Sequence, residues 1–214
     1  MRKPEFITFT GVDDRTDLDA VESLSKQYPI EWGVLFSPTQ QGRTPRYPGL
    51  ARLHEIHERS RSLRLAAHLC GEHARRIVGG ALPDLPAVIS NVYQRAQINH
   101  IYPQPHRITR FAEMARTPCI GQFIAGPFPA NETIQWLFDP SSGAGIVPPV
   151  WPRHPGGDRL VGFAGGMSPE NVATVIERIN SSGQYWIDME TRVRTDDDWL
   201  DLAKCEAVCV QVYG

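Results

Sequence analysis

Short apolar runs alternate with amphipathic segments along most of the chain. Residues 6–11 form a β-branched and aromatic run, and from Asp17 apolar residues recur at helical spacing as far as Tyr28. Residues 30–36 repeat the apolar run, and a second helical pattern follows a loop rich in Pro, Gly and Arg. Strands and helices differ in the period of their apolar positions, so this part of the chain predicts strand, helix, strand, helix.

The same alternation continues to the end of the sequence. Further strands are expected at residues 65–70, 97–101, 119–124, 134–139, 160–164 and 185–189. Helical patterns cover residues 50–57, 72–78, 85–93 and 107–115, and the spacing leaves room for only a short, irregular helix between the fifth and sixth strands. Strands that alternate with helices in this way predict an α/β protein, either a closed parallel barrel or a doubly wound sheet.

The last two helices carry start signals. Ser168 and Pro169 are expected as the N-cap and first-turn residues of one helix, because Ser accepts hydrogen bonds from free backbone N–H groups and Pro lacks one. A final helix is expected over residues 196–204, since its acidic start suits the positive end of the helix dipole. The apolar tail 208–212 is expected either to pack against the first helix or to form a homodimer interface.

Length and composition narrow the class of protein. The 214 residues suit one domain over residues 1–214, near the lower limit for an eight-stranded barrel. A net charge of -2 gives no basic excess for binding nucleic acid. No apolar run is long enough to span a bilayer and no signal peptide is evident, so a cytoplasmic protein without a membrane partner is expected. The four cysteines lack C-x-x-C spacing and are expected as buried thiols.

One motif is specific enough to suggest a family. Residues 162–172, Gly-Phe-Ala-Gly-Gly-Met-Ser-Pro-Glu-Asn-Val, closely resemble the seventh-strand loop of phosphoribosylanthranilate isomerases, which are TIM barrels. Fainter matches follow in the family's order at residues 8–12, 32–38, 137–139, 143–145 and 186–188, and Trp151 resembles a tryptophan that follows the family's sixth-strand loop. The resemblance spans nearly the whole chain and implies a single (β/α)8 TIM barrel.

The resemblance also implies roles in an Amadori rearrangement, for which the family uses a general base on the first strand and a general acid on the sixth. Asp139 matches the acid, and Thr10 stands where the family has its catalytic cysteine. A threonine hydroxyl is too weak a base to take a proton from carbon, so another group must replace the cysteine. Gly165 and Gly166, which precede Ser168, match the family's phosphate-binding turn.

Polar residues at the expected strand ends complete the set of candidates. Asp13, His68 and Glu190 are the candidate catalytic partners of Asp139, while Asp188 is expected to serve the structure. Ligand contacts are expected from Thr10, Arg46, Asn99, Gln122, Gly165, Gly166, Ser168 and Arg192. The loop of residues 40–48, which contains Arg46, has the composition of a lid, and Arg pairs well with carboxylate or phosphate. Polar residues at this end of a TIM barrel indicate a functional pocket.

Three functions fit these residues. The first is an isomerase or lyase that acts on a sugar-derived or phosphorylated substrate, with Asp139 as general acid or base. The second is a non-catalytic barrel that binds a small molecule, and the arginines suit an anionic one. The third is a metal-dependent hydrolase or aldolase, although no H-x-H or H-E-x-x-H spacing supports a metal site. No cofactor is expected.

Overall fold

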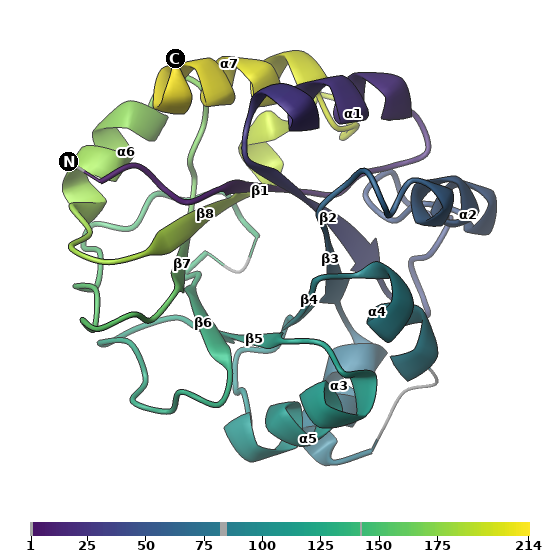
Figure 1. Cartoon of the computed structure of the whole chain (residues 1–214), viewed down its shortest axis with the longest axis horizontal. Coiled ribbons are helices and arrows are strands. Elements are labelled where there is room, and N and C mark those ends of the chain that lie inside the picture. The colour runs from purple at the N-terminus through teal and green to yellow at the C-terminus, as the bar shows by residue number, and fades with distance from the viewer. Residues whose placement is uncertain (1, 82–84, 142) are drawn as a thin grey trace.

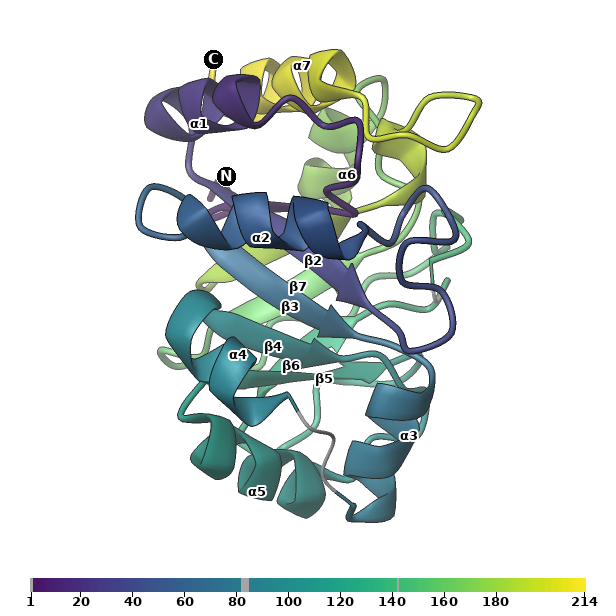
Figure 2. The same ribbon diagram turned by 90° about the vertical axis from the view of Figure 1, so that its right-hand side faces the viewer.

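Parallel strands close into a barrel in the computed structural model, which describes residues 2–81, 85–141 and 143–214. The strands are β1 (Ile7–Thr10), β2 (Ile30–Phe36), β3 (Leu65–Leu69), β4 (Arg95–Ile98), β5 (Cys119–Phe123), β6 (Gln135–Phe138), β7 (Val161–Ala164) and β8 (Tyr185–Met189). Each strand pairs with its neighbours in sequence, and β8 pairs with β1 to complete the ring (Figure 1). The strands point to one side of the molecule (Figure 2). The expected TIM barrel is confirmed.

Helices cover most of the barrel wall. They are α1 (Leu18–Gln27), α2 (Leu50–Glu58), α3 (Glu72–Gly79), α4 (Pro86–Val92), α5 (Pro105–Ala115), α6 (Val172–Ile179) and α7 (Leu202–Tyr213), with the 3-10 turn η1 (Thr191–Val193) after β8. Asp17 begins α1, because its carboxylate accepts hydrogen bonds from the backbone N–H groups of Asp19 and Ala20. None of the helices among the described residues is long and apolar enough to cross a bilayer.

Two connections lack a covering helix. The segment between β5 and β6 forms bends and irregular coil instead of the expected short helix, and the described residues between β6 and β7 form no helix either. Aromatic rings cover the wall in their place. Phe128 packs on Phe123 and Phe163, with ring centroids 5.0 and 5.3 Å apart. Trp151 packs on Phe138 and on the same Phe163, at 5.9 and 6.0 Å.

Several boundaries differ from the sequence prediction, and three of the differences have a clear physical cause. Strand β4 begins at Arg95 rather than residue 97, because the polar Arg95 is buried inside the barrel rather than exposed before it. Helix α6 has Asn171 rather than Ser168 as its N-cap; the Asn171 side chain accepts from the Ser168 backbone N–H at 2.8 Å and closes a turn before the helix. Helix α7 begins after Asp201, because Asp198 has a φ of 65°, which a right-handed helix does not contain.

The apolar tail belongs to α7 and is buried within the chain. Cys205, Val208, Cys209 and Val212 are buried, and α7 contacts α1 and α6. The carboxyl-terminal helix lies beside α1 in both ribbon views (Figures 1 and 2). Burial against the first helix, one of the two explanations for this apolar segment, therefore accounts for it.

The amino-terminal end of the barrel interior holds a closed ion-pair cluster. Glu31 is fully buried and accepts hydrogen bonds from the guanidinium groups of Arg95 and Arg64, the latter at 3.0 Å. Burial opposes ionisation of Glu31, but the charges and hydrogen bonds of Arg95 and Arg64 outweigh it and hold its pKa below the ordinary value. The Arg95 guanidinium also lies 4.2 Å from the centroid of the Trp186 ring.

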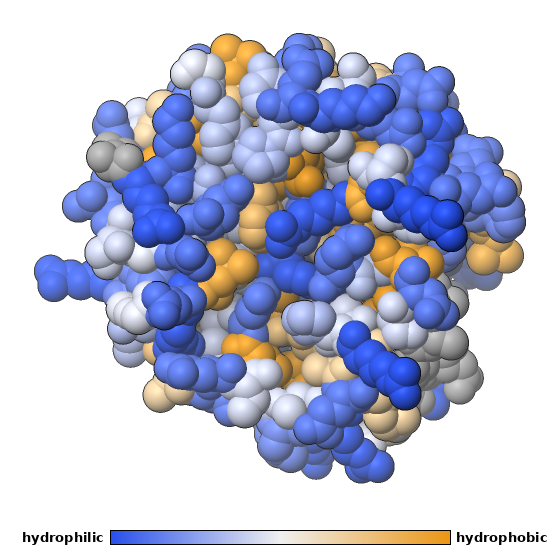
Figure 3. Space-filling view, in the orientation of Figure 1, coloured by the Kyte–Doolittle hydropathy of each residue, from blue (hydrophilic) through white to orange (hydrophobic). Residues whose placement is uncertain are grey.

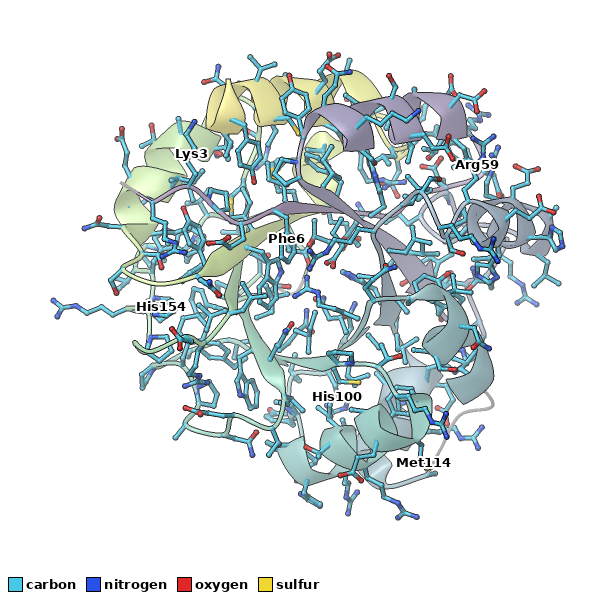
Figure 4. All side chains as sticks on the ribbon, in the orientation of Figure 1. Lys3, Phe6, Arg59, His100, Met114 and His154 are labelled. Carbon is cyan, nitrogen blue, oxygen red and sulfur yellow. The ribbon has the colours of Figure 1, made fainter. Side chains whose placement is uncertain are left out.

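Phe6 borders this cluster. The Arg64 guanidinium lies 3.8 Å from the centroid of its ring, and Phe6 lies near the centre of the ring of strands (Figure 4). In the same view, hydrophilic side chains gather at the centre of the molecular face (Figure 3). The interior of this barrel is thus polar at its amino-terminal end, where TIM barrels are usually filled by branched apolar residues.

Candidate active site

A cavity of about 290 Å³ opens at the carboxyl-terminal ends of the strands. Its lining includes nine of the sequence-predicted residues: Arg46, His68, Asn99, Gln122, Asp139, Gly165, Gly166, Glu190 and Arg192. A cavity of this size suits a small molecule, and this end of the barrel is where TIM-barrel enzymes have their sites. Three of the predicted residues, Thr10, Asp13 and Ser168, are not part of the lining.

Asp139 lies directly after β6 and is fixed by its neighbours. Its backbone N–H donates to the carbonyl of Phe123 at 3.0 Å, which continues the pairing of β6 with β5. One carboxylate oxygen, Oδ1, accepts from the backbone N–H and the hydroxyl of Ser141, at 3.1 and 3.0 Å. The other, Oδ2, accepts from the side-chain amide of Gln122 at 3.3 Å. The sequence therefore places a buried, oriented carboxyl on the β6 side of the cavity.

A second carboxyl, Asp188, faces the cavity from β8. The prediction that Asp188 only serves the structure did not anticipate this position in the lining. Thr10 Oγ1 donates a hydrogen bond to Asp188 Oδ1 at 2.8 Å, so Thr10 lies directly behind the cavity wall. Burial raises the pKa of Asp188 well above its ordinary value, and the nearby charges of Glu190 and Asp139 add to the rise, while the Thr10 hydrogen bond opposes it.

Glu190 and Arg46 form an ion pair across the rim. Arg46 Nη1 donates to Glu190 Oε1 at 2.6 Å, and Arg46 Nε donates to both oxygens of Asp198 at 2.9 Å. The loop after β2 is thus connected to the segments after β8. Burial raises the pKa of Glu190, although the charge of Arg46 opposes this. Arg192 donates from Nε to the carbonyl of Gly145 at 3.2 Å and belongs to the same side of the cavity.

His68 and Asn99 belong to a hydrogen-bonded network on β3 and β4. The side-chain amide nitrogen of Gln97 lies 3.3 Å from His68 Nδ1 and donates to Asn99 Oδ1 at 2.9 Å. Asn99 Nδ2 in turn donates to the sulfur of Cys70 at 3.1 Å. Burial lowers the pKa of His68 to about 4, so its imidazole is neutral at neutral pH.

The glycine turn after β7 is present but tightly packed. Gly165 and Gly166 line the cavity with φ values of 133° and 60°, in the left-handed region that favours glycine. A Cβ on Gly166 would lie 2.5 Å from the backbone nitrogen of Val147, so the turn also requires glycine for its contact with the loop after β6. Ser168 lies behind this turn and does not reach the cavity.

Asp13 has a structural environment that the sequence did not indicate. It is fully buried, its Oδ2 accepts from Arg194 Nη2 at 2.8 Å and from the backbone N–H of Leu200 at 2.6 Å, and its Oδ1 accepts from the Thr16 hydroxyl. Because Asp13 is outside the cavity lining and its oxygens are already hydrogen-bonded, the structure does not bring this candidate base to the site.

Besides Asp188, the polar cavity residues that sequence reasoning missed include Tyr47, Cys70 and Gln97. Cys70 ends an apolar run and was expected as an inert buried thiol; it is only partly buried, and burial of the sulfur raises its pKa to about 11. Gln97 falls inside a strand, and only the strand register shows that it pairs with His68 on β3. Within the described residues, no group of three or more His, Cys, Asp and Glu side chains is placed to hold a metal ion.

Comparison with solved structures supports the fold, whereas comparison with family models and curated sequences gives no match. No protein-family model matches the chain, and no curated protein matches its sequence. Solved structures of phosphoribosylanthranilate isomerases do match. The enzyme from Thermotoga maritima aligns with a TM-score of 0.63 and 15% identity, covering 99% of this chain and 98% of the other. The enzyme from Pyrococcus furiosus aligns with a TM-score of 0.62 and 17% identity, covering 97% of this chain and 98% of the other.

A third match is a phosphoribosylanthranilate isomerase in complex with reduced 1-(o-carboxyphenylamino)-1-deoxyribulose 5-phosphate, with a TM-score of 0.62 and 15% identity over 96% of this chain and 97% of the other. The alignments extend over almost the full length of both partners, while identity stays low. The chain is therefore a divergent TIM barrel with the fold of the phosphoribosylanthranilate isomerases.

Proposed function

We propose that this protein is an isomerase of sugar-derived small molecules, in which Asp139 and Asp188 transfer protons on opposite sides of the bound substrate. The observation that carries the proposal is the pair of buried carboxyls that line one cavity from β6 and β8. Isomerisation of an aldose derivative requires removal of a proton from carbon and delivery of a proton to oxygen. Two carboxyls in different environments suit these two roles.

Asp188 is the proposed base. A carboxylate with an ordinary pKa is a weak base, and the raised pKa of Asp188 makes it a stronger one. The Thr10 hydroxyl holds Oδ1, which fixes the orientation of the carboxylate while the other oxygen receives the proton. Thr10 thereby positions the base, at the place where the resemblance sets the family's cysteine.

Asp139 is the proposed acid. Its proton goes to the ring or carbonyl oxygen while Asp188 takes the proton from the adjacent carbon, which gives an enol. Asp188 then gives its proton to the neighbouring carbon, while the other hydroxyl of the enol gives its proton to Asp139 and becomes the new carbonyl, so both carboxyls regain their starting states and atoms and charges balance without a cofactor. The other candidate bases fit less well, because Asp13 is outside the cavity and Glu190 is paired with Arg46. His68, with its lowered pKa, is also a weak base.

The rim suits a substrate with an anionic group. Arg192 and the Gly165–Gly166 turn border the same part of the cavity, and backbone N–H groups and Arg both bind phosphate. Arg46 neutralises the charge of Glu190, which would otherwise repel an anion. The solved isomerase that holds a reduced deoxyribulose 5-phosphate derivative is consistent with a phosphorylated ligand for this fold.

Proton abstraction can be tested before the substrate is identified. Phosphorylated aldoses and ketoses are incubated with the protein in deuterium oxide, and loss of the carbon-bound proton next to the carbonyl is followed by NMR. We expect exchange with at least one sugar phosphate, and a decrease of at least about 10²-fold in Asp139→Asn and in Asp188→Asn. Asp197→Asn, an exposed carboxyl outside the cavity, is the matched control.

The outcomes separate the proposal from its alternatives. Exchange that survives both substitutions would remove the two carboxyls from the mechanism. If sugar phosphates stabilise the protein against heat and no exchange occurs with any of them, the chain is a binding barrel rather than an isomerase.

A further inference from the structure

The loop that connects β2 to α2, residues 37–48, is hydrogen-bonded to itself and borders the cavity. The backbone N–H of Gly42 donates to the carbonyl of Tyr47 at 3.0 Å, and the side-chain amide of Gln41 donates to the carbonyl of Pro48 at 2.6 Å. Tyr47 lines the cavity. A compact surface loop that bonds to itself can move as one body, and such loops frequently serve function. We call residues 37–48 the gate loop.

Arg46 ties the gate loop to the segment after β8. Its Nη1 donates to Glu190 Oε1 at 2.6 Å and to Thr191 Oγ1 at 3.3 Å, and its Nε donates to both carboxylate oxygens of Asp198. Glu190 and Thr191 line the cavity, as Arg46 does. Because β1 lies between β2 and β8 in the barrel, this tie passes over the end of β1 and joins two segments of the cavity rim.

The segment after β8 is the fixed partner in this tie. The buried Arg194 donates from Nε to the backbone carbonyl of Asp198 at 2.9 Å and from Nη2 to the buried Asp13 at 2.8 Å. Asp198 itself has a φ of 65°, a conformation that costs energy in residues other than glycine. A turn of this kind favours Gly or Asn, and neither would supply the carboxylate that Arg46 contacts. The strained residue therefore indicates a functional contact.

We propose that the gate loop opens and closes the cavity and that Arg46 holds it closed. Separation of Arg46 from Glu190 and Asp198 frees the loop to admit a ligand, and return of the ion pairs encloses the ligand away from water. The side chains of Arg46, Glu190 and Asp198 are 25%, 23% and 41% exposed, and ion pairs exposed to this extent are weak enough to break and re-form. This inference does not depend on the reaction, and it applies to a binding barrel as well as to an isomerase.

Cys70 provides a reporter inside the cavity. It follows β3 directly, lines the cavity and is partly buried, whereas the other three cysteines are buried. Burial raises the pKa of the Cys70 thiol to about 11, and the hydroxyl of Tyr47 on the gate loop opposes the rise, so the thiol lies next to this loop. Opening of the loop should therefore speed the reaction of Cys70 with N-ethylmaleimide, an uncharged thiol reagent.

The test compares two arginines of the gate loop. Arg46→Gln removes the tie, and Arg43→Gln removes an equal charge from an exposed position outside the cavity lining. At about pH 8 and low salt, we expect Cys70 to be labelled about three- to fivefold faster in Arg46→Gln than in the wild type, as for the loss of a partly exposed ion pair. Arg43→Gln should match the wild type. Mass spectrometry of the Cys70 peptide measures the rate, and the other three cysteines should stay protected in each protein.

Salt tests the wild-type protein without any substitution. An increase from about 0.05 to about 1 M sodium chloride should speed the labelling of Cys70 in the wild type, because salt screens exposed ion pairs, and should have no such effect in Arg46→Gln. A small free thiol measured alongside corrects for the effect of salt on the reagent. Equal rates in the wild type and Arg46→Gln, or a wild-type rate that salt does not change, would overturn the proposal. So would faster labelling in Arg43→Gln, or labelling of all four cysteines at one rate, which would indicate opening of the whole fold.

Discussion

The two ends of the barrel interior are both polar, but their polar groups are paired to different degrees. At the amino-terminal end, Glu31 is held by two arginines and its pKa is lowered. At the carboxyl-terminal end, Asp188 accepts a hydrogen bond from Thr10 as its one partner within the described ranges, and its pKa is raised. The difference teaches that polarity in a barrel does not by itself mark a site. A closed network stabilises the fold, and an incomplete one leaves groups free to act on a ligand.

The largest effect should come from opening the closed end. Arg95→Met leaves the buried Glu31 with Arg64 and the Thr8 hydroxyl as hydrogen-bond donors and without the charge of Arg95, and we expect the free energy of unfolding to fall by about 3–5 kcal/mol. Urea denaturation measures this. The double variant Arg95→Met with Glu31→Gln is the control, because removal of both charges should restore part of the loss. Equal losses in the single and double variants would mean that packing, rather than the unpaired charge, sets the cost.

The second-largest effect is expected on the stability of the protein at acidic pH. Because the pKa of His68 is lowered to about 4 in the folded protein, the unfolded chain takes up this proton more readily. The stability it contributes is present above its ordinary pKa of about 6.5 and is lost as the pH falls toward 4, by up to about 3 kcal/mol. His68→Gln should flatten this part of the pH–stability curve, and the exposed His106→Gln should not. An unchanged curve in His68→Gln would place its imidazole in contact with water.

Asp188 should make stability depend on pH in the opposite direction to His68. Its folded-state pKa is raised, so its ionisation costs stability as the pH rises from the ordinary carboxyl range through the raised pKa. Asp188→Asn removes that cost and keeps the acceptor for Thr10, so we expect this variant to be about 1–2 kcal/mol more stable than wild type at pH 8. The two proteins should converge at pH 4. A variant that is less stable at pH 8 would mean that Asp188 is paired like Glu31.

The smallest effect is expected at the rim. Arg46 and Glu190 are each about a quarter exposed, with side-chain accessibilities of 25% and 23%. Solvent screens such pairs, so Arg46→Gln should cost less than about 1 kcal/mol, and less at high salt. Thermal unfolding in low and high salt measures this. A loss as large as that of Arg95→Met would show that the rim pair is as dry as the cluster at the other end.

Most of the fold could be predicted from the sequence because the outward faces of the strands are apolar and the helices are amphipathic. The start of β4 was placed two residues late because the charged residue Arg95, which is buried, interrupts the apolar pattern. The residues of the site were harder to predict than the fold. Asp139 and Glu190 lie at strand ends, where a polar residue is conspicuous, and both line the cavity.

Asp188 lies within an apolar strand, and its environment depends on a hydrogen bond from Thr10, which is 178 positions away in the sequence. Asp13 shows the converse, because nothing near it in the sequence indicates the ion pair that it forms with Arg194. A periodic pattern reports which residues are buried, and it does not report their partners across the barrel.

The wall between β5 and β7 has a consequence for how this chain tolerates change. Elsewhere a helix covers each strand, so the loss of one side chain is shared among several neighbours. Here Phe128 and Trp151 cover the wall as single residues, and both rest on the ring of Phe163. Replacement of Phe128 and Trp151 by small residues would therefore expose this part of the barrel wall to water. Two such substitutions on a covering helix would leave the rest of that helix in place. The shorter connections make this side of the barrel more sensitive to mutation than the sides covered by helices.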